Sequence, residues 1–136
     1  MLGPAWNWAG RGQYGYDPLF LTALIITESS FYNRARSNRN AHGLMQLKPA
    51  TAVALASEMH LQWKGTHTLY DLKKNIALGA YYLNKLVDRF GDLTLALEAY
   101  NQGPSRLSRF LRKGYLPQRY SKKVLKNYRR IRFQPI

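Results

Sequence analysis

Apolar residues recur every three or four positions along most of this chain, which is the spacing of one face of an α-helix. No stretch alternates apolar and polar residues over a convincing strand length. Asp17 and Pro18 have the residue types of a helix start, and Gly91 is placed to end the longest helical stretch. The helices expected from these signals cover residues 17–31, 49–59, 71–90, 93–101, 104–113 and 121–131. We therefore expect a mainly α-helical fold with little or no β structure.

The chain has the length of one domain. Its 136 residues match the common domain size of about 100–150 residues. Apolar residues make up 46% of the sequence, which is enough for a packed core. Residues 1–16 are rich in glycine and aromatic residues and have no helical period, so we expect an arm that packs on the domain. The domain itself is expected to span residues 17–136.

The chain is strongly basic. It has 21 Lys and Arg against 7 Asp and Glu, and residues 106–136 contain no acid at all. Such a surface attracts polyanions such as nucleic acid, anionic lipid or a cell wall, although it also suits a solvated face that chiefly supports solubility. Because no nucleic-acid-binding motif occurs, we do not expect nucleic acid as a partner.

Residue content also limits the possible kinds of site. Without cysteine there are no disulfides, no thiolate nucleophile and no Cys-bound zinc. The three histidines lack metal-ligand spacing, and no glycine-rich phosphate-binding pattern occurs, so we expect no metal and no cofactor. No apolar run approaches the roughly 20 residues of a membrane span, and the first ten residues do not resemble a secretory signal.

Glu28 is the candidate catalytic residue. It lies four residues after Leu24, at the end of an apolar helical stretch. A glutamate on the buried side of a helix end loses hydration when it ionises, so its pKa should rise and it could act as a general acid near neutral pH. The same position also suits a glutamate that is simply solvated. Tyr100 and Asn101, at the end of another expected helix, are either local caps or donors to a ligand.

Five blocks, in order, resemble the catalytic domain of the soluble lytic transglycosylases, which share the goose-type lysozyme fold. The blocks are the pair Glu28–Ser29, Ser37 nine residues after the glutamate, "GLMQ" at 43–46, "NIALGAYYL" at 75–83 and "LALEAYNQGP" at 95–104. Each block alone is a weak signal, but five at compatible spacing are specific. The resemblance implies a single lysozyme-like helical domain that acts on peptidoglycan.

The resemblance also implies roles for individual residues. The glutamate matching Glu28 protonates the glycosidic oxygen between N-acetylmuramic acid and N-acetylglucosamine, and then takes a proton from the C6 hydroxyl to leave a 1,6-anhydro end. One carboxylate suffices because the N-acetyl group of the sugar assists, whereas most glycosidases need two. The residues expected to bind substrate are Ser37, Met45, Gln46, Tyr100, Asn101 and Tyr120.

Three features depart from the family pattern. Lys48 replaces a methionine, which puts a charge near the substrate groove or turns it outward. The segment "YLPQRY" lacks the Glu-Thr-Arg that usually precedes the tyrosine matching Tyr120. Glu98 replaces a small residue, and we expect it to be either solvated on its helix or a local second carboxylate.

These residues lead to one expected function and two alternatives. The chain is expected to be a peptidoglycan lytic transglycosylase, with a goose-type lysozyme-like hydrolase and a non-catalytic wall-binding protein on the same fold as alternatives. We expect a monomer whose partners are glycan strands of peptidoglycan and, through the basic C-terminal face, an anionic cell-wall or membrane surface. Such a substrate predicts export to the periplasm or the cell wall, with a signal outside this chain.

Overall fold

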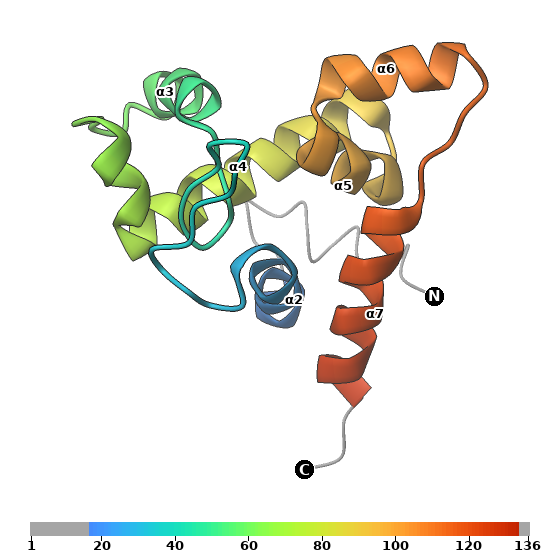
Figure 1. Cartoon of the computed structure of the whole chain (residues 1–136), viewed down its shortest axis with the longest axis horizontal. Coiled ribbons are helices and arrows are strands. Elements are labelled where there is room, and N and C mark those ends of the chain that lie inside the picture. Colours follow the sequence, from blue (N-terminus) through green and yellow to red (C-terminus); the bar gives the residue numbers. More distant parts are fainter. Residues whose placement is uncertain (1–16, 134–136) are drawn as a thin grey trace.

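The computed structural model describes residues 17–133, which form six α-helices and one short 3-10 helix (Figure 1). The elements are α2 (Pro18–Ser29), α3 (Pro49–Glu58), η1 (Thr66–Tyr70), α4 (Leu72–Phe90), α5 (Leu93–Gln102), α6 (Pro104–Arg112) and α7 (Arg119–Phe133). Between residues 17 and 133 there is no strand, and β pairing is limited to two isolated antiparallel bridges, which join His42 to Arg36 and to Leu47. The expected helical fold is confirmed, while the expected arm at 1–16 lies outside the described residues.

Local side-chain chemistry starts the helices where the sequence predicts. Asp17, Asp71 and Asp92 each accept a hydrogen bond from a backbone N–H in the first turn of the following helix, at 2.9, 3.0 and 2.9 Å. Gly91 ends α4 with a φ of 71°, a left-handed conformation that glycine adopts without steric cost. The long α4 and the shorter α5 are therefore joined by a tight turn.

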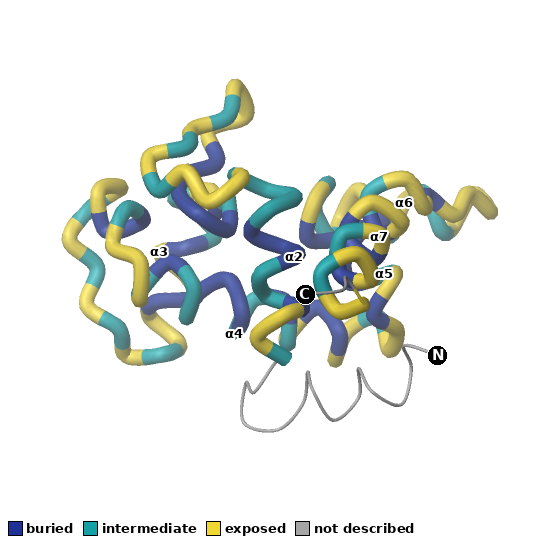
Figure 2. Tube along the Cα trace, turned by 90° about the horizontal axis from the view of Figure 1, so that it is seen from below, coloured by how far each residue is buried: buried dark blue, intermediate teal, exposed yellow. Residues whose placement is uncertain are grey.

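All six α-helices, η1 and the loop between α2 and α3 contribute residues to the core, and Figure 2 shows buried stretches of α2 and α4 inside the molecule. Most of α5 is enclosed, and its buried residues are Leu93, Ala96, Leu97, Glu98, Ala99 and Tyr100. On α4, Gly79 allows the loop after α2 to approach closely. A Cβ atom at Gly79 would lie 2.6 Å from the sulfur of Met45, so any larger residue there would force the Met45 side chain to move.

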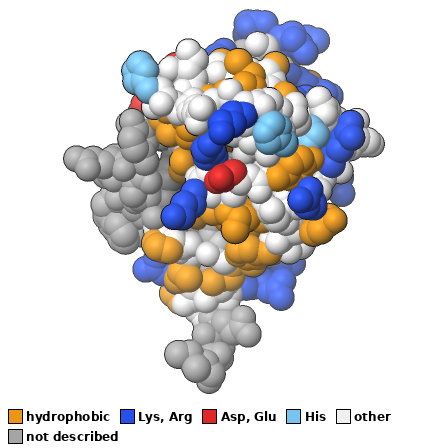
Figure 3. All heavy atoms as spheres, turned by 90° about the vertical axis from the view of Figure 1, so that its left-hand side faces the viewer, with side chains coloured by type: hydrophobic (Ala, Val, Ile, Leu, Met, Phe, Trp, Pro, Cys, Tyr) orange, Lys and Arg blue, Asp and Glu red, His pale blue; other side chains and the backbone are white. Residues whose placement is uncertain are grey.

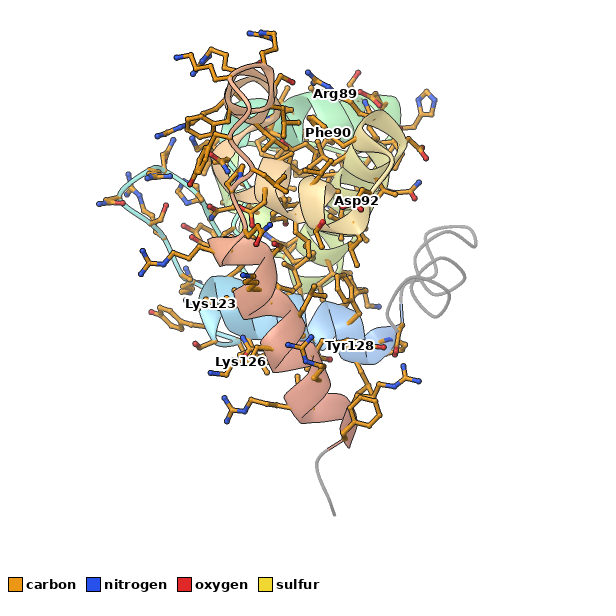
Figure 4. The ribbon with its side chains drawn as sticks, turned by 90° about the vertical axis from the view of Figure 1, so that its right-hand side faces the viewer. Arg89, Phe90, Asp92, Lys123, Lys126 and Tyr128 are labelled. Atoms are coloured by element: carbon orange, nitrogen blue, oxygen red, sulfur yellow. The ribbon has the colours of Figure 1, made fainter. Side chains whose placement is uncertain are left out.

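The C-terminal helix α7 packs on α2. The rings of Phe20 and Tyr128 meet edge to face with centroids 5.6 Å apart, and Figure 4 shows Tyr128 on the α2 side of α7. The Asn127 amide donates to Thr27 Oγ1 at 2.8 Å, and the Tyr128 hydroxyl donates to Asp17 Oδ2 at 2.6 Å. These contacts hold the second half of α7 against α2, and the start of α7 meets the last turn of α2 where the Tyr120 hydroxyl donates to Glu28.

The surface is basic. On the face drawn in Figure 3, Lys and Arg side chains are spread across the molecule and acidic side chains occupy little area. Within residues 17–133, no helix combines the length and the apolar character needed to cross a bilayer.

Candidate active site

Glu28 lies in the last turn of α2, one residue before the helix ends at Ser29. The chain then turns away through Ser30, which has a left-handed φ of 51°. The hydroxyl of Ser29 donates to the carbonyl of Leu44 at 2.8 Å and so ties the end of α2 to the loop formed by residues 30–48. This arrangement leaves the Glu28 side chain half-buried where helix and loop meet.

The surroundings of Glu28 change its acidity. Burial raises the pKa of Glu28 from its ordinary value of 4.5 to about 7, because the ionised carboxylate would lose hydration. Tyr120, whose hydroxyl donates to Glu28 Oε2, and the Lys123 ammonium on α7 (Figure 4) both lower that pKa and oppose the effect of burial. Burial and the neighbouring carboxylate in turn raise the pKa of Tyr120 well above its usual range, so Tyr120 keeps its proton. Glu28 can therefore give and take a proton near neutral pH, which a fully solvated glutamate would not do.

A groove of about 660 Å³ passes Glu28, and we call it the main groove. Its walls come from the end of α2, the 30–48 loop, the start of α3, α4, α5 and the start of α6. The lining residues are Glu28, Ser37, Arg39, Ala41, Gln46, Leu47, Lys48, Thr51, Tyr82, Tyr100, Asn101, Gln102, Gly103, Pro104 and Arg106. Five of the predicted site residues share it, namely Glu28, Ser37, Gln46, Tyr100 and Asn101.

Two of these residues also hold the loop in shape. The Ser37 hydroxyl oxygen accepts two backbone N–H groups of the loop, each at 3.1 Å. The Gln46 amide donates to the carbonyls of Ala35 at 3.1 Å and Gly43 at 2.9 Å. The groove wall is thus organised by internal hydrogen bonds before any ligand binds.

Met45 lies beneath the groove and not in its wall. Its side chain is 0% exposed and packs in the core. Its N–H donates to Asn75 Oδ1 at 2.8 Å, and its carbonyl accepts the Tyr100 hydroxyl at 2.6 Å. In contrast to the expectation of direct contact with substrate, the Met45 side chain is absent from the groove lining, and the residue instead anchors the loop.

Two residues that organise this site were not predicted from the sequence. Asn75 is fully buried and, besides binding Met45, donates to the carbonyls of His42 at 3.1 Å and Leu69 at 2.9 Å. Tyr82 lines the groove and packs against Tyr100 with ring centroids 5.3 Å apart. Both lie in the "NIALGAYYL" block. For Asn75 the available signal was a polar residue in an otherwise apolar part of that block, and for Tyr82 it was the block itself.

Of the two outcomes expected for Glu98, a solvated helix residue and a local second carboxylate, the solvated one is wrong. It is only 2% exposed, because α5 packs against α4, α6 and α7. Its Oε2 accepts the backbone N–H of Ser121 at 2.7 Å, in the first turn of α7. The preceding residue, Tyr120, donates to Glu28. Two carboxylates from different helices therefore hold adjacent residues at the start of α7.

The main groove is positively charged. Lys48 is exposed and lines it, together with Arg39 and Arg106, whereas Glu28 is the one acidic residue in the lining. Lys48 therefore puts its charge at the groove, which is one of the two outcomes considered from the sequence. Among residues 17–133, no three His, Asp or Glu side chains gather in a way that could hold a metal ion. The geometry suits acid–base chemistry on a polar or anionic ligand.

Comparison with known proteins identifies the family of this chain. The family described as "Transglycosylase SLT domain" matches residues 7–122 of this chain. A transglycosylase of Enterobacteria phage PRD1 is 38% identical over 119 residues, which are 88% of this chain and 40% of the phage protein. A putative soluble lytic murein transglycosylase of Haemophilus influenzae is 37% identical over 93 residues, which are 68% of this chain and 16% of that protein.

A solved structure shares the fold. The crystal structure of the 70 kDa soluble lytic transglycosylase of Escherichia coli superposes with a TM-score of 0.78 at 23% identity, over 98% of this chain and 24% of that one. The predicted lysozyme-like fold is thereby confirmed. This chain spans less than half the length of each of these relatives.

Proposed function

The chain belongs to the Transglycosylase SLT domain family, and from this premise we propose that it is a lytic transglycosylase that cleaves the glycan strands of peptidoglycan. The bond broken is the β-1,4 bond between N-acetylmuramic acid and N-acetylglucosamine, and the product carries a 1,6-anhydro-muramic end. Support comes from the family match, from the transglycosylases to which the chain is similar, and above all from one observation. Glu28 is a carboxyl with a pKa of about 7 at the main groove.

The first half of the proposed reaction uses Glu28 as an acid. The protonated carboxyl gives its proton to the glycosidic oxygen as the bond between that oxygen and C1 of the muramic residue breaks, and the bonding electron pair leaves with the oxygen. The N-acetyl oxygen of the same sugar stabilises the positive charge that develops at C1. This assistance replaces the second carboxylate of ordinary glycosidases.

The second half uses Glu28 as a base. The carboxylate takes the proton of the C6 hydroxyl while O6 attacks C1 and displaces the N-acetyl oxygen, which closes the 1,6-anhydro ring. Glu28 ends protonated and ready for another cycle, and no water is consumed. A pKa of about 7 suits both steps, because the two protonation states are then close in free energy at neutral pH.

The other residues are proposed to position the substrate. Ser37, Gln46 and Asn101 line the main groove and present polar side chains to a sugar, while Tyr100 lines it beside Tyr82. Tyr120 orients the Glu28 carboxyl through its hydroxyl hydrogen bond. Because intact peptidoglycan lies outside the cytoplasmic membrane, we propose that the chain acts in the periplasm or at the cell wall.

Digestion of purified sacculi, followed by mass spectrometry of the released muropeptides, tests the proposal. Anhydro-muramic ends are the expected result. Reducing muramic ends would instead identify a hydrolase of the goose-type lysozyme kind, and sedimentation with sacculi without release of fragments would identify a wall-binding protein.

A pair of variants tests the role of Glu28 in that assay. Glu28→Gln keeps the shape of the side chain and removes the proton, so activity should fall by about 10²-fold or more. Glu58→Gln is the matched control, because Glu58 is an exposed acid paired with Lys85 and lies outside the lining of the groove. Full activity in Glu28→Gln would contradict the assignment.

A further inference from the structure

A second hollow of about 420 Å³ adjoins the main groove, and we call it the side pocket. It is built by α5, α6, the 113–118 turn and the start of α7. The lining residues are Arg39, Glu98, Asn101, Gln102, Arg106, Phe110, Tyr115, Pro117, Arg119, Tyr120 and Lys123. Four of them, Arg39, Asn101, Gln102 and Arg106, also line the main groove, so the two hollows share a border.

The side pocket is rich in cations. Arg39, Arg106, Arg119 and Lys123 line it, and none of the four forms a salt bridge with another residue in the 17–133 part of the chain. The one carboxylate in the lining, Glu98, is already bound by the Ser121 N–H. Several cations around a concave surface concentrate the positive field inside it, so the side pocket favours an anionic group.

The rest of the lining is aromatic and apolar. The rings of Phe110 and Tyr115 meet edge to face at 5.1 Å, and the Arg106 guanidinium lies 5.5 Å above the Phe110 ring. Pro117 is buried beside them. A mixed surface of this kind fits an organic chain that carries carboxylates better than a bare phosphate, because it contacts carbon as well as charge.

The shared border decides how such a ligand would arrive. A polymer held in the main groove could place a branch across Arg39 and Arg106 into the side pocket. In peptidoglycan the branch on each muramic residue is a short peptide that ends in carboxylates. We propose that the side pocket binds the carboxylates of this peptide branch while the sugar strand occupies the main groove, an inference that rests on the proposed function.

Binding measurements on the full chain test the inference. In a Glu28→Gln background, which prevents turnover, the protein is titrated by calorimetry with two glycan fragments of equal sugar length. One fragment carries its acidic peptides, and an amidase has removed them from the other. The peptide-bearing fragment should bind about tenfold more tightly, since one charge-assisted hydrogen bond has roughly that effect.

Variants locate the effect in the side pocket. Arg119→Gln, and independently Tyr115→Ala, should remove most of that preference and leave affinity for the peptide-free fragment unchanged, because both residues line the side pocket alone. Arg112→Gln and Arg130→Gln, outside both hollows, make the same charge change as Arg119→Gln and should leave the preference intact.

Two results would overturn the inference. One is equal affinity of the unmodified side pocket for both fragments, and the other is an equal loss in the Arg119 and Arg130 variants, which would indicate general charge attraction. The outcome is separable from the proposed activity. If the protein cleaves sacculi but binds both fragments with equal affinity, only peptide binding by the side pocket is refuted. If it prefers the peptide-bearing fragment through Arg119 but does not cleave sacculi, only the proposed transglycosylase activity is refuted.

Discussion

Replacing Glu28 by glutamine should make the protein more stable, and increasingly so as the pH rises. In the native state burial raises the pKa of Glu28 from 4.5 to about 7, so the folded protein binds this proton more tightly than the unfolded chain does. Between these two pH values the unfolded chain has released a proton that the folded chain still holds. The free energy of unfolding therefore falls as the pH rises from 4.5 to 7, and stays lower above that range.

The size of the effect follows from the pKa. A change from 4.5 to about 7 corresponds to roughly 3 kcal/mol of lost stability above pH 7, at about 1.4 kcal/mol per pKa unit. Glutamine cannot ionise, yet its side-chain oxygen can still accept the hydroxyl hydrogen bond of Tyr120. Glu28→Gln should therefore raise the free energy of unfolding by roughly 3 kcal/mol at pH 8.5 but by only about 1 kcal/mol at pH 5.

Thermal unfolding at the two pH values measures this difference. For a domain of this size about 1 kcal/mol shifts the melting temperature by roughly 3 °C, so Glu28→Gln should melt about 10 °C higher at pH 8.5 and about 3 °C higher at pH 5. The control is Glu58→Gln. Hydrogen bonds from Lys85 and Tyr81 lower the pKa of Glu58, so the stabilisation from its charge is lost only in more acidic solution. The change in melting temperature caused by Glu58→Gln should therefore be the same at pH 5 and at pH 8.5. A Glu28→Gln shift that is independent of pH would refute the argument.

Two further variants probe how the site is held. Tyr120→Phe removes a hydrogen bond that lowers the Glu28 pKa, so the alkaline limb of the pH–activity profile should move to higher pH while the maximal rate falls about tenfold; an unmoved limb would mean that Tyr120 does not act on the carboxyl. Asn75→Ala removes three buried hydrogen bonds and should cost roughly 3 kcal/mol or more in urea unfolding. Asn84→Ala is its control, since the Asn84 side-chain oxygen has no hydrogen-bond partner among the described residues, and an equal loss in both variants would contradict the role of Asn75.

The helices could be predicted because their signals are local. Asp17, Asp71 and Asp92 cap helices through N–H groups two or three residues away, and Gly91 ends α4 by its own conformation. The spacing of three or four residues between the apolar side chains of each buried helix face is equally short in range. The placement of Glu28 at the end of α2 followed from the same kind of signal.

The shape of the 30–48 loop could not be predicted, because distant residues determine it. Met45 is held by Asn75 and Tyr100, which lie 30 and 55 positions away along the chain. From spacing alone the Met45 side chain had no assigned direction, and the family pattern suggested the groove. The structure turns it into the core, over the space that Gly79 leaves on α4.

Glu98 could not be placed from the sequence for a related reason. A lone acid on a helix is ordinarily solvated. The apolar residues around Glu98 indicate that α5 is buried, but no local signal identifies a partner for its carboxylate. Its partner, the Ser121 N–H, lies 23 positions further along the chain. The start of a helix carries partial positive charge, so a buried carboxylate is favourable there. Glu98 thus supports α7 from α5, and its Oε2 is engaged by backbone.

The basic C-terminal segment consequently has an internal role that its composition concealed. Helix α7 contains no acid, yet three carboxylates from elsewhere in the chain are hydrogen-bonded to it, those of Asp17, Glu28 and Glu98. Their hydrogen-bond partners on α7 are, in that order, the Tyr128 hydroxyl, the Tyr120 hydroxyl and the Ser121 N–H. One side of α7 therefore binds three of the chain's seven acids. Burial raises the pKa of Glu28, and Tyr120 and Lys123 on α7 lower it again, while Arg119 and Lys123 also line the side pocket. Binding to the cell wall would explain only the cations of this segment that remain exposed. The segment also acts inside the molecule, because without α7 the carboxyl of Glu28 would lose the Tyr120 hydrogen bond and the Lys123 charge that oppose the rise of its pKa.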